Sequence, residues 1–277
     1  MKFTKMQGAG NDYVYVNCFE EKIDDRPEMA RRVSDRHFGI GGDGLICICP
    51  SDRADFLMDM YNADGSHAGM CGNGIRCVGK YVYEHGMTNK TELLVESGGA
   101  VKTLWLNVDG GVVESVRVDM GSPELDPGKI PVDLPVGRVV EVPVSIGGKR
   151  WDITCVSMGN PHAVVFVDDA DSLDLEKTGP QFEHNRIFPE RINTEFVQVI
   201  DGSTLKMRVW ERGSGETLAC GTGACASLVA ATLTGRCAGR AKVLVRGGEL
   251  EIEWDQAENK VYMTGPAAAV FEGEFYI

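Results

Sequence analysis

The sequence predicts an α/β protein of the α+β type, built as two pseudo-symmetric duplicated lobes. Each lobe is expected to be a strand-rich, barrel-like sheet around one central helix. Two observations predict this fold: short motifs recur at one fixed spacing of 149 residues, and each half combines many strand-like segments with one long helical segment. The chain has 277 residues and is 43% hydrophobic, enough for two cores. We expect residues 1–117 and 265–277 to form the first lobe and residues 118–264 the second.

The repeat extends over most of each half with almost no insertion. A single spacing therefore indicates duplication of one ancestral lobe. The matched pairs are Gly10-Asn11 with Gly159-Asn160, Cys71-Gly72-Asn73-Gly74 with Cys220-Gly221-Thr222-Gly223, Gly98-Gly99 with Gly247-Gly248, and Trp105 with Trp254.

The elements of each half follow the same order. Alternating or β-branched runs predict strands over 14–16 and 57–61, and over 164–167 and 205–210 in the second half. Helices are expected over 74–85 and 223–234, ending at Gly86 and Gly235. The paired glycines predict hairpin turns, and the matched tryptophans are expected in the core.

Composition excludes several classes of protein. A net charge of −13 disfavours nucleic acid and anionic membrane surfaces as partners. The sequence has no apolar run of about 20 residues and no signal-peptide core, so we expect a cytoplasmic protein. Nine cysteines without a Cys-x-x-Cys spacing argue against a disulfide framework and against a structural metal site. Residues 39–44 fit G-x-G-x-x-G, but a strand-like segment follows, which indicates a glycine turn and not a dinucleotide site.

Two of the cysteines differ from the rest. Only Cys71 and Cys220 match each other in the repeat, whereas the other seven face different residue types, as packing thiols would. Both precede a predicted helix, where unpaired N–H groups and the helix dipole favour an anion. We therefore expect a lowered pKa for these thiols and a docking place for a substrate carboxylate.

Paired thiols of this kind suit proton transfer at an α-carbon. One thiolate removes the α-proton, and the opposite thiol delivers a proton to the other face. The N–H donors stabilise the charge that moves onto the carboxylate. The sequence thus predicts an amino-acid racemase or epimerase that needs no cofactor.

Supporting residues cluster near the same motifs. Asn11 and Asn160 begin matched loops and can bind substrate polar groups. His162 and Glu211 could tune a thiol, although a histidine in the core or at the surface explains His162 equally well. Arg212 has no arginine partner in the repeat, which suits a substrate with a second carboxylate, and a solvated arginine is the alternative.

With these motifs, the chain resembles the diaminopimelate epimerase family over essentially its whole length. The segments that carry the resemblance are residues 8–12, 61–66, 70–77, 158–162, 191–193 and 210–223. One departure is Gly44, where some members of the family carry a glutamine. A side-chain contact from that position is then lost or supplied by another residue.

The resemblance implies interconversion of LL- and meso-2,6-diaminopimelate in lysine and peptidoglycan precursor synthesis. It implies no pyridoxal phosphate, no other cofactor and no metal, and a homodimer in the cytoplasm. Cys71 and Cys220 would be the paired acid and base, and His162 and Glu211 would tune them. The substrate would be bound by Asn11, Asn62, Gly72, Asn73, Asn160, Asn193, Glu211, Arg212, Gly221 and Thr222.

Three alternatives remain open from the sequence. A proline racemase would keep the chemistry, but its substrate has no distal carboxylate for Arg212 to bind. An isomerase like those of phenazine synthesis would share the fold without the cysteine pair. A thiol-redox protein would use Cys71 and Cys220 as a disulfide.

Overall fold

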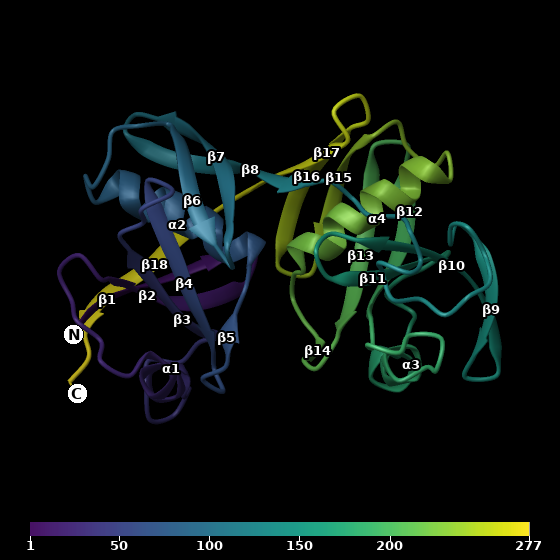
Figure 1. Ribbon diagram of the computed structural model, residues 1–277, viewed down its shortest axis with the longest axis horizontal. Coiled ribbons are helices and arrows are strands. Elements are labelled where there is room, and N and C mark those ends of the chain that lie inside the picture. The colour runs from purple at the N-terminus through teal and green to yellow at the C-terminus, as the bar shows by residue number, and fades with distance from the viewer. Residues whose placement is uncertain (277) are drawn as a thin grey trace. The chain divides into compact units, whose positions relative to one another are not determined.

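The computed structural model describes residues 1–276, and the chain divides into two compact units. Unit 1 comprises Met1–Asp119 and the segment from Thr264 onward, and unit 2 comprises Met120–Met263. Each is strand-rich with a helix running through it (Figure 1). The predicted fold class, a mixed fold of two duplicated lobes, is confirmed.

In unit 1 the strands pair in the order β18-β1-β2-β3-β4-β6-β7-β8, with β5 added beside β4. The pairs β2–β3 and β4–β6 are parallel and the others antiparallel. The elements are β1 (Lys2–Gly8), β2 (Asn11–Asn17), α1 (Arg26–Ser34), β3 (Gly44–Cys49), β4 (Phe56–Asn62), β5 (His67–Ala68), α2 (Gly72–Glu84), β6 (Glu92–Ser97), β7 (Ala100–Asp109), β8 (Val112–Gly121) and β18 (Ala268–Glu274).

Unit 2 repeats this topology. Its strands pair in the order β9-β10-β11-β12-β13-β15-β16, and the parallel pairs β11–β12 and β13–β15 correspond to β2–β3 and β4–β6. The elements are β9 (Val142–Ile146), β10 (Lys149–Ser157), β11 (Pro161–Phe166), α3 (Leu175–Glu183), β12 (Asn193–Asp201), β13 (Thr204–Glu211), β14 (Gly215–Glu216), α4 (Gly221–Leu233), β15 (Arg240–Val245), β16 (Gly248–Asp255) and β17 (Lys260–Gly265).

The central helices are α2 and α4, whose bounds differ by the repeat spacing at both ends. Most of their residues are buried, and α4 is made largely of small apolar side chains. Each helix is followed by a glycine in the left-handed region, Gly86 at φ 67° and Gly235 at φ 70°, as the sequence predicted. Both begin two residues earlier than predicted, because each helix starts directly after its cysteine.

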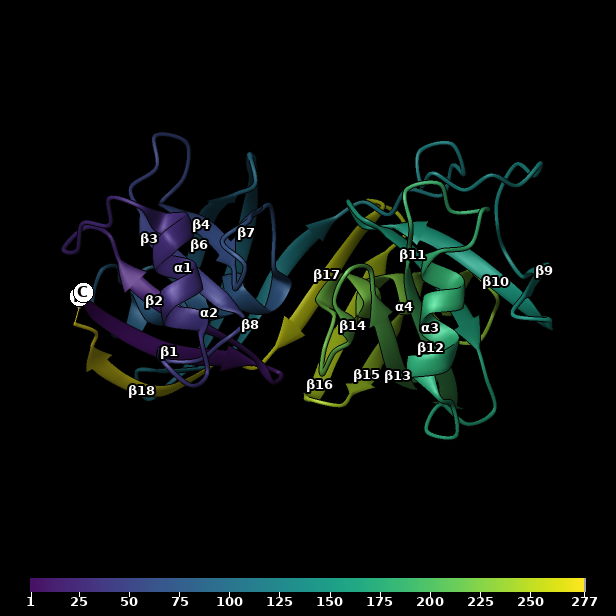
Figure 2. The ribbon, with the colours of Figure 1, turned by 90° about the horizontal axis from the view of Figure 1, so that it is seen from below.

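Each unit also contains a second helix that the sequence analysis missed. Helix α1 packs against β2, β3 and β4, and α3 packs against β12, β13 and β14 (Figure 2). Asp25 and Asp174 cap these helices by accepting the N–H groups of Glu28 and Lys177. The single central helix expected in each lobe is confirmed, and α1 and α3 are additional helices, although their capping aspartates were visible in the sequence.

The predicted strands and turns are confirmed, with one exception in side-chain placement. Both hairpins form where they were predicted: Gly98-Gly99 is the turn of β6–β7, whereas the turn of β15–β16 is Arg246-Gly247, one residue earlier than expected, and Gly248 begins β16. Trp105 and Trp254, which were expected in the core, are only half-buried. Their indole N–H groups donate to Glu92 and Asn259, both at 3.2 Å near the surface. A strand exposes every second side chain, and these rings lie on its outer side.

Candidate active site

Both matched cysteines cap a central helix. Cys71 and Cys220 have extended backbone conformations, and their sulfur atoms accept the N–H groups of Gly74 at 3.3 Å and Gly223 at 3.4 Å. The predicted placement at helix N-termini is confirmed. Gly72-Asn73 and Gly221-Thr222 form the first turn after each thiol, where backbone N–H groups have no acceptor within the helix. An anion such as a carboxylate can bind there.

Asn11, the first residue of β2, links the first thiol to Asp43. The Cys71 Sγ lies 3.1 Å from Asn11 Oδ1, and the Asn11 amide donates to Asp43 at 2.7 Å. Asp43 also accepts the backbone N–H of Asp12 at 3.1 Å. The carboxylate therefore fixes the amide so that its oxygen faces the sulfur. Asp43 belongs to the glycine-rich segment 39–44, and strand β3 follows this segment, as the sequence predicted.

A buried arginine, Arg76, hydrogen-bonds to the first turn of α2. Arg76 is fully buried and donates to Gly72 O at 3.0 Å and to Asn73 Oδ1 at 2.9 Å. Its Nε also donates to Pro266 O at 3.1 Å. Asn73 is thereby held by the helix itself. Asn62, at the end of β4, donates to Ser66 Oγ at 3.0 Å.

Cys220 lies in a buried and acidic environment. Thr222 Oγ1 is 3.5 Å from its sulfur, and Glu211 accepts a short hydrogen bond from Thr217. Burial, followed by the charges of Glu211 and Glu195, raises the pKa of the Cys220 thiol well above its ordinary value. Burial likewise raises the pKa of Glu211.

The expectation of a lowered thiol pKa at a helix N-terminus was therefore wrong for Cys220. The Gly223 N–H and the Thr222 hydroxyl do favour the thiolate, but desolvation and two neighbouring carboxylates outweigh them. For Cys71 the lowered pKa stays a prediction. The environment of Cys220 therefore favours the protonated thiol.

His162 is fully buried between two oxygen atoms. Its Nδ1 lies 2.7 Å from Glu195 Oε1 and its Nε2 lies 2.9 Å from Asn160 Oδ1. The matched asparagine of unit 2 thus contacts the histidine, whereas Asn11 contacts its cysteine directly. Glu195, which has no exposed surface, was not identified from the sequence.

Asn193 and Arg212 are linked to each other through the backbone. The Asn193 amide donates to Pro161 O at 2.8 Å and accepts the Arg212 N–H at 2.9 Å. The Arg212 guanidinium donates to Glu190 O at 2.8 Å near the surface. The guanidinium therefore keeps further N–H groups available, while Asn193 mainly ties β11 to the loop after β13.

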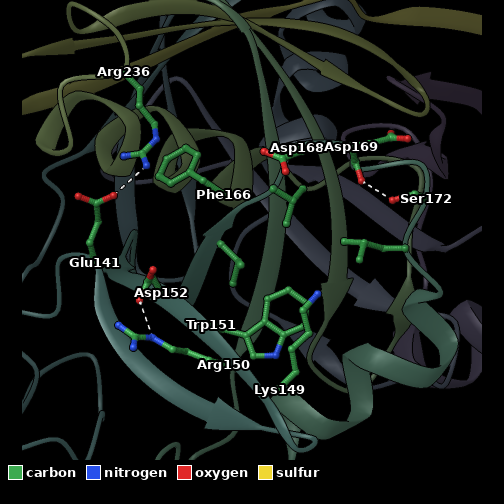
Figure 3. A pocket seen from close by; sticks show the side chains of 13 residues that line it. Glu141, Lys149, Arg150, Trp151, Asp152, Phe166, Asp168, Asp169, Ser172 and Arg236 are labelled. Atoms are coloured by element: carbon green, nitrogen blue, oxygen red, sulfur yellow. Dashed lines mark hydrogen bonds and ion pairs between the residues drawn. The ribbon is translucent and has the colours of Figure 1, made fainter.

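The described residues offer no second candidate for the active site among metal-binding groups, membrane-spanning helices or the depression described below. Within residues 1–276 no group of three or more His, Cys, Asp or Glu side chains is arranged to hold a metal ion, and no helix is long and apolar enough to cross a membrane. Each of the nine cysteines is present as a thiol. A depression of about 420 Å³ beside β10 and β11 contains none of the predicted site residues. Two of its arginines are paired with carboxylates: Arg236 lies 2.8 Å from Glu141 and Arg150 lies 3.9 Å from Asp152 (Figure 3).

Comparison with known proteins decides the family. The diaminopimelate epimerase family matches residues 3–125 and 154–270. The diaminopimelate epimerase of Acetivibrio thermocellus is 60% identical over 99% of this chain and 98% of its own length, and that of Agathobacter rectalis is 58% identical over the full length of both. The chain belongs to the diaminopimelate epimerase family.

Solved structures extend the likeness to the fold of this epimerase family. A phenazine biosynthesis protein of the PhzF family from Bacillus anthracis covers the whole chain and 99% of its own with a TM-score of 0.72 at 16% identity. A probable proline racemase from Agrobacterium radiobacter covers the whole chain and 93% of its own with a TM-score of 0.70 at 13% identity. These two proteins share the fold alone.

The structure also accounts for the glycine at position 44 of this diaminopimelate epimerase family member. A Cβ at Gly44 would lie 2.1 Å from Tyr61 O and 2.8 Å from Tyr13 Cε1, so the ring of Tyr13 occupies the space of a side chain there. Burial and the neighbouring Cys71 raise the pKa of the Tyr13 phenol, against a hydrogen bond with Asn11. Tyr13 lies 149 positions before His162, and that spacing was the signal that could have identified it.

Proposed function

We propose that this protein interconverts LL- and meso-2,6-diaminopimelate by a proton transfer at the α-carbon that needs no cofactor. Membership of the family and 60% identity to a curated diaminopimelate epimerase support the substrate and the isomerase class. The observation that carries the chemistry is the matched pair of thiols, each capping a central helix. The reaction belongs to lysine and peptidoglycan precursor synthesis.

In the proposed mechanism, the substrate carboxylate binds the N–H groups of Gly72-Asn73 and Gly221-Thr222. One sulfur, as thiolate, takes the α-proton, and the other thiol gives its proton to the opposite face. The raised pKa of the Cys220 thiol supports Cys220 as the donor when the cycle starts from the resting state. Cys71 is then the base, and the roles exchange for the reverse reaction. The helix N-termini stabilise charge that develops on the carboxylate.

The other predicted residues take roles in binding and tuning. Asn11, Asn62, Asn160 and Asn193 would bind substrate polar groups, and His162 and Glu211 would adjust the protonation of Cys220. The guanidinium of Arg212 would bind the distal carboxylate in a fork. Binding of a distal carboxylate favours diaminopimelate over proline, which has none.

Fully reduced protein incubated with LL-diaminopimelate, without added cofactor, tests the proposal. Chiral chromatography should show the meso isomer accumulating to equilibrium, while L-proline in a parallel reaction should stay unchanged. Conversion of proline alone would reject the proposed substrate and retain the chemistry. No conversion of either compound would reject the function.

We also propose that the active form is a cytoplasmic homodimer, as the resemblance to the family implies. Light scattering coupled to size exclusion should give twice the chain mass of 30.1 kDa. A mass of one chain at working concentration would reject the dimer. Recovery of the protein in the cytosolic fraction of its own cells tests the compartment.

A further inference from the structure

A buried carboxylate contacts His162 in unit 2. Glu195 on β12 has no exposed surface, and its Oε1 lies 2.7 Å from His162 Nδ1. Among the described residues no donor reaches its other oxygen, Oε2. Burial of a carboxylate is costly unless it is fully paired, so its presence here requires a reason beyond packing.

The other lobe shows that this position does not need a charge. Ile46 on β3 lies 149 positions before Glu195. A Cβ on Gly74 would lie 2.7 Å from Ile46 Cδ1, and a Cβ on Gly223 would lie 2.5 Å from Glu195 Oε1. Both side chains therefore pack against the third residue of a central helix. Since an apolar side chain fills the place in unit 1, packing alone does not explain Glu195.

The contacts of His162 indicate what the carboxylate does. Nδ1 faces the carboxylate oxygen Glu195 Oε1 and Nε2 faces Asn160, so the ring is held at both nitrogens and Nδ1 donates to the carboxylate. The charge of His162 acts on Glu211, which in turn hydrogen-bonds Cys220. The titratable groups around the ring are thus Glu195, Glu211 and Cys220, with Cys155 of β10 near Glu195.

We propose that Glu195 is a positioning residue for the reaction, which holds the His162 ring through Nδ1, keeps a proton on that nitrogen and orients the ring beside Glu211. The inference rests on the proposed function. It makes the two thiols chemically unequal, because the corresponding places around Cys71 hold Tyr13 and Ile46. Glu195 then acts, through His162 and Glu211, on the Cys220 half of the proton transfer.

Three substitutions test the role of Glu195. Glu195→Gln removes the charge at constant shape, Glu195→Ile installs the side chain of the other lobe, and Glu195→Asp retains a carboxylate. Ile46→Val is the matched control in unit 1. We expect kcat/KM for LL-diaminopimelate to fall about 10- to 100-fold in Glu195→Gln and Glu195→Ile, as for other carboxylates that orient a functional histidine. Partial recovery is expected in Glu195→Asp.

Two readouts separate this role from a structural one. The kcat/KM–pH profile should change shape in Glu195→Gln and Glu195→Ile but not in Ile46→Val. The ¹⁵N shifts of His162 in the substrate-free protein should show a protonated Nδ1 in the wild type and a different distribution of the proton between the two ring nitrogens in Glu195→Gln and Glu195→Ile. Far-UV circular dichroism establishes that each variant compared is folded.

The outcomes distinguish the inference from the proposed function. Unchanged His162 shifts in Glu195→Gln, or lower activity with an unaltered pH profile, would overturn the role of Glu195. An inactive wild-type protein would reject the proposed function, and the NMR comparison would still decide whether Glu195 controls the protonation of His162.

Discussion

The substitution Gly44→Ala tests the packing beside Cys71. Gly44 begins β3 and pairs with Asn62 of β4. A Cβ there would meet Tyr61 O at 2.1 Å and the Tyr13 ring at 2.8 Å, well inside van der Waals contact. The carbonyl belongs to the β3–β4 ladder and cannot move aside without a shift of the strand. We therefore expect a loss of stability and a displaced Tyr13.

The magnitude follows from two opposing effects. Overpacking of a well-filled site costs about 1–3 kcal/mol, and contact with backbone places Gly44→Ala at the upper end. Replacement of glycine by alanine also restricts the unfolded chain, which stabilises the protein by about 0.4–1 kcal/mol. The net expectation is a decrease of about 2 kcal/mol in the free energy of unfolding, or roughly 4–8 °C in Tm at about 2–4 °C per kcal/mol.

Urea unfolding followed by circular dichroism measures this change, with Gly69→Ala as the control in the same unit. A Cβ at Gly69 would meet no atom within 4 Å, so its stability should be unchanged or slightly increased. The activity of Gly44→Ala at a temperature where it is folded should also fall, because Tyr13 contacts Cys71. Equal stabilities for Gly44→Ala and the wild type would refute the close packing of Tyr13 against position 44.

Three further predictions concern the site itself. Cys71→Ala and Cys220→Ala should each lower kcat by about 10²- to 10⁴-fold or more, because a general acid or base usually contributes that much. The control variant Cys237→Ala should keep its activity. Substantial turnover by Cys71→Ala or Cys220→Ala would reject the two-thiol scheme. Arg212→Ala should raise KM about 10- to 100-fold, the loss of a charged hydrogen bond, with unchanged unfolding, and an unaltered KM would favour a smaller substrate. Burial raises the pKa of the Cys220 thiol in the folded state above its value of about 8.5 in the unfolded chain. The protonated thiol therefore makes its full contribution to folding stability below about pH 8.5, and this contribution declines as the pH rises toward the raised pKa. The unfolding free energy of Cys220→Ala should therefore fall less steeply above pH 8.5 than that of the wild type, and parallel curves would contradict the raised pKa.

Local chemistry explains which parts of the fold were predictable. The central helices were placed correctly because a cysteine cap, two or more glycines and a terminal glycine are all sequence signals. Helices α1 and α3 carried equally local signals in Asp25 and Asp174, which were overlooked. The burial of the Trp105 side chain could not be predicted from neighbouring residues, because only the assembled sheet decides which face of a strand is covered.

The candidate site divides in the same way. Cys71 and Cys220 were identified because the repeat singles them out among nine cysteines. The pKa of Cys220 is raised by burial and then by Glu211 and Glu195, of which Glu195 comes from a distant strand, so a rule based on the helix terminus alone gave the wrong direction. Tyr13 and Glu195 were detectable through the repeat as counterparts of His162 and Ile46, but only the structure gives those pairs a meaning.

The central claim is proton transfer between two different groups on opposite faces of the α-carbon. The direct measurement is the isotope content of both isomers at early times, with LL-diaminopimelate in D₂O and fully reduced protein. Two thiols predict a meso product that carries one deuterium at the inverted centre, while the remaining LL substrate keeps its α-proton. A meso product that retains protium, or LL substrate that exchanges as fast as product forms, would contradict the two-thiol mechanism.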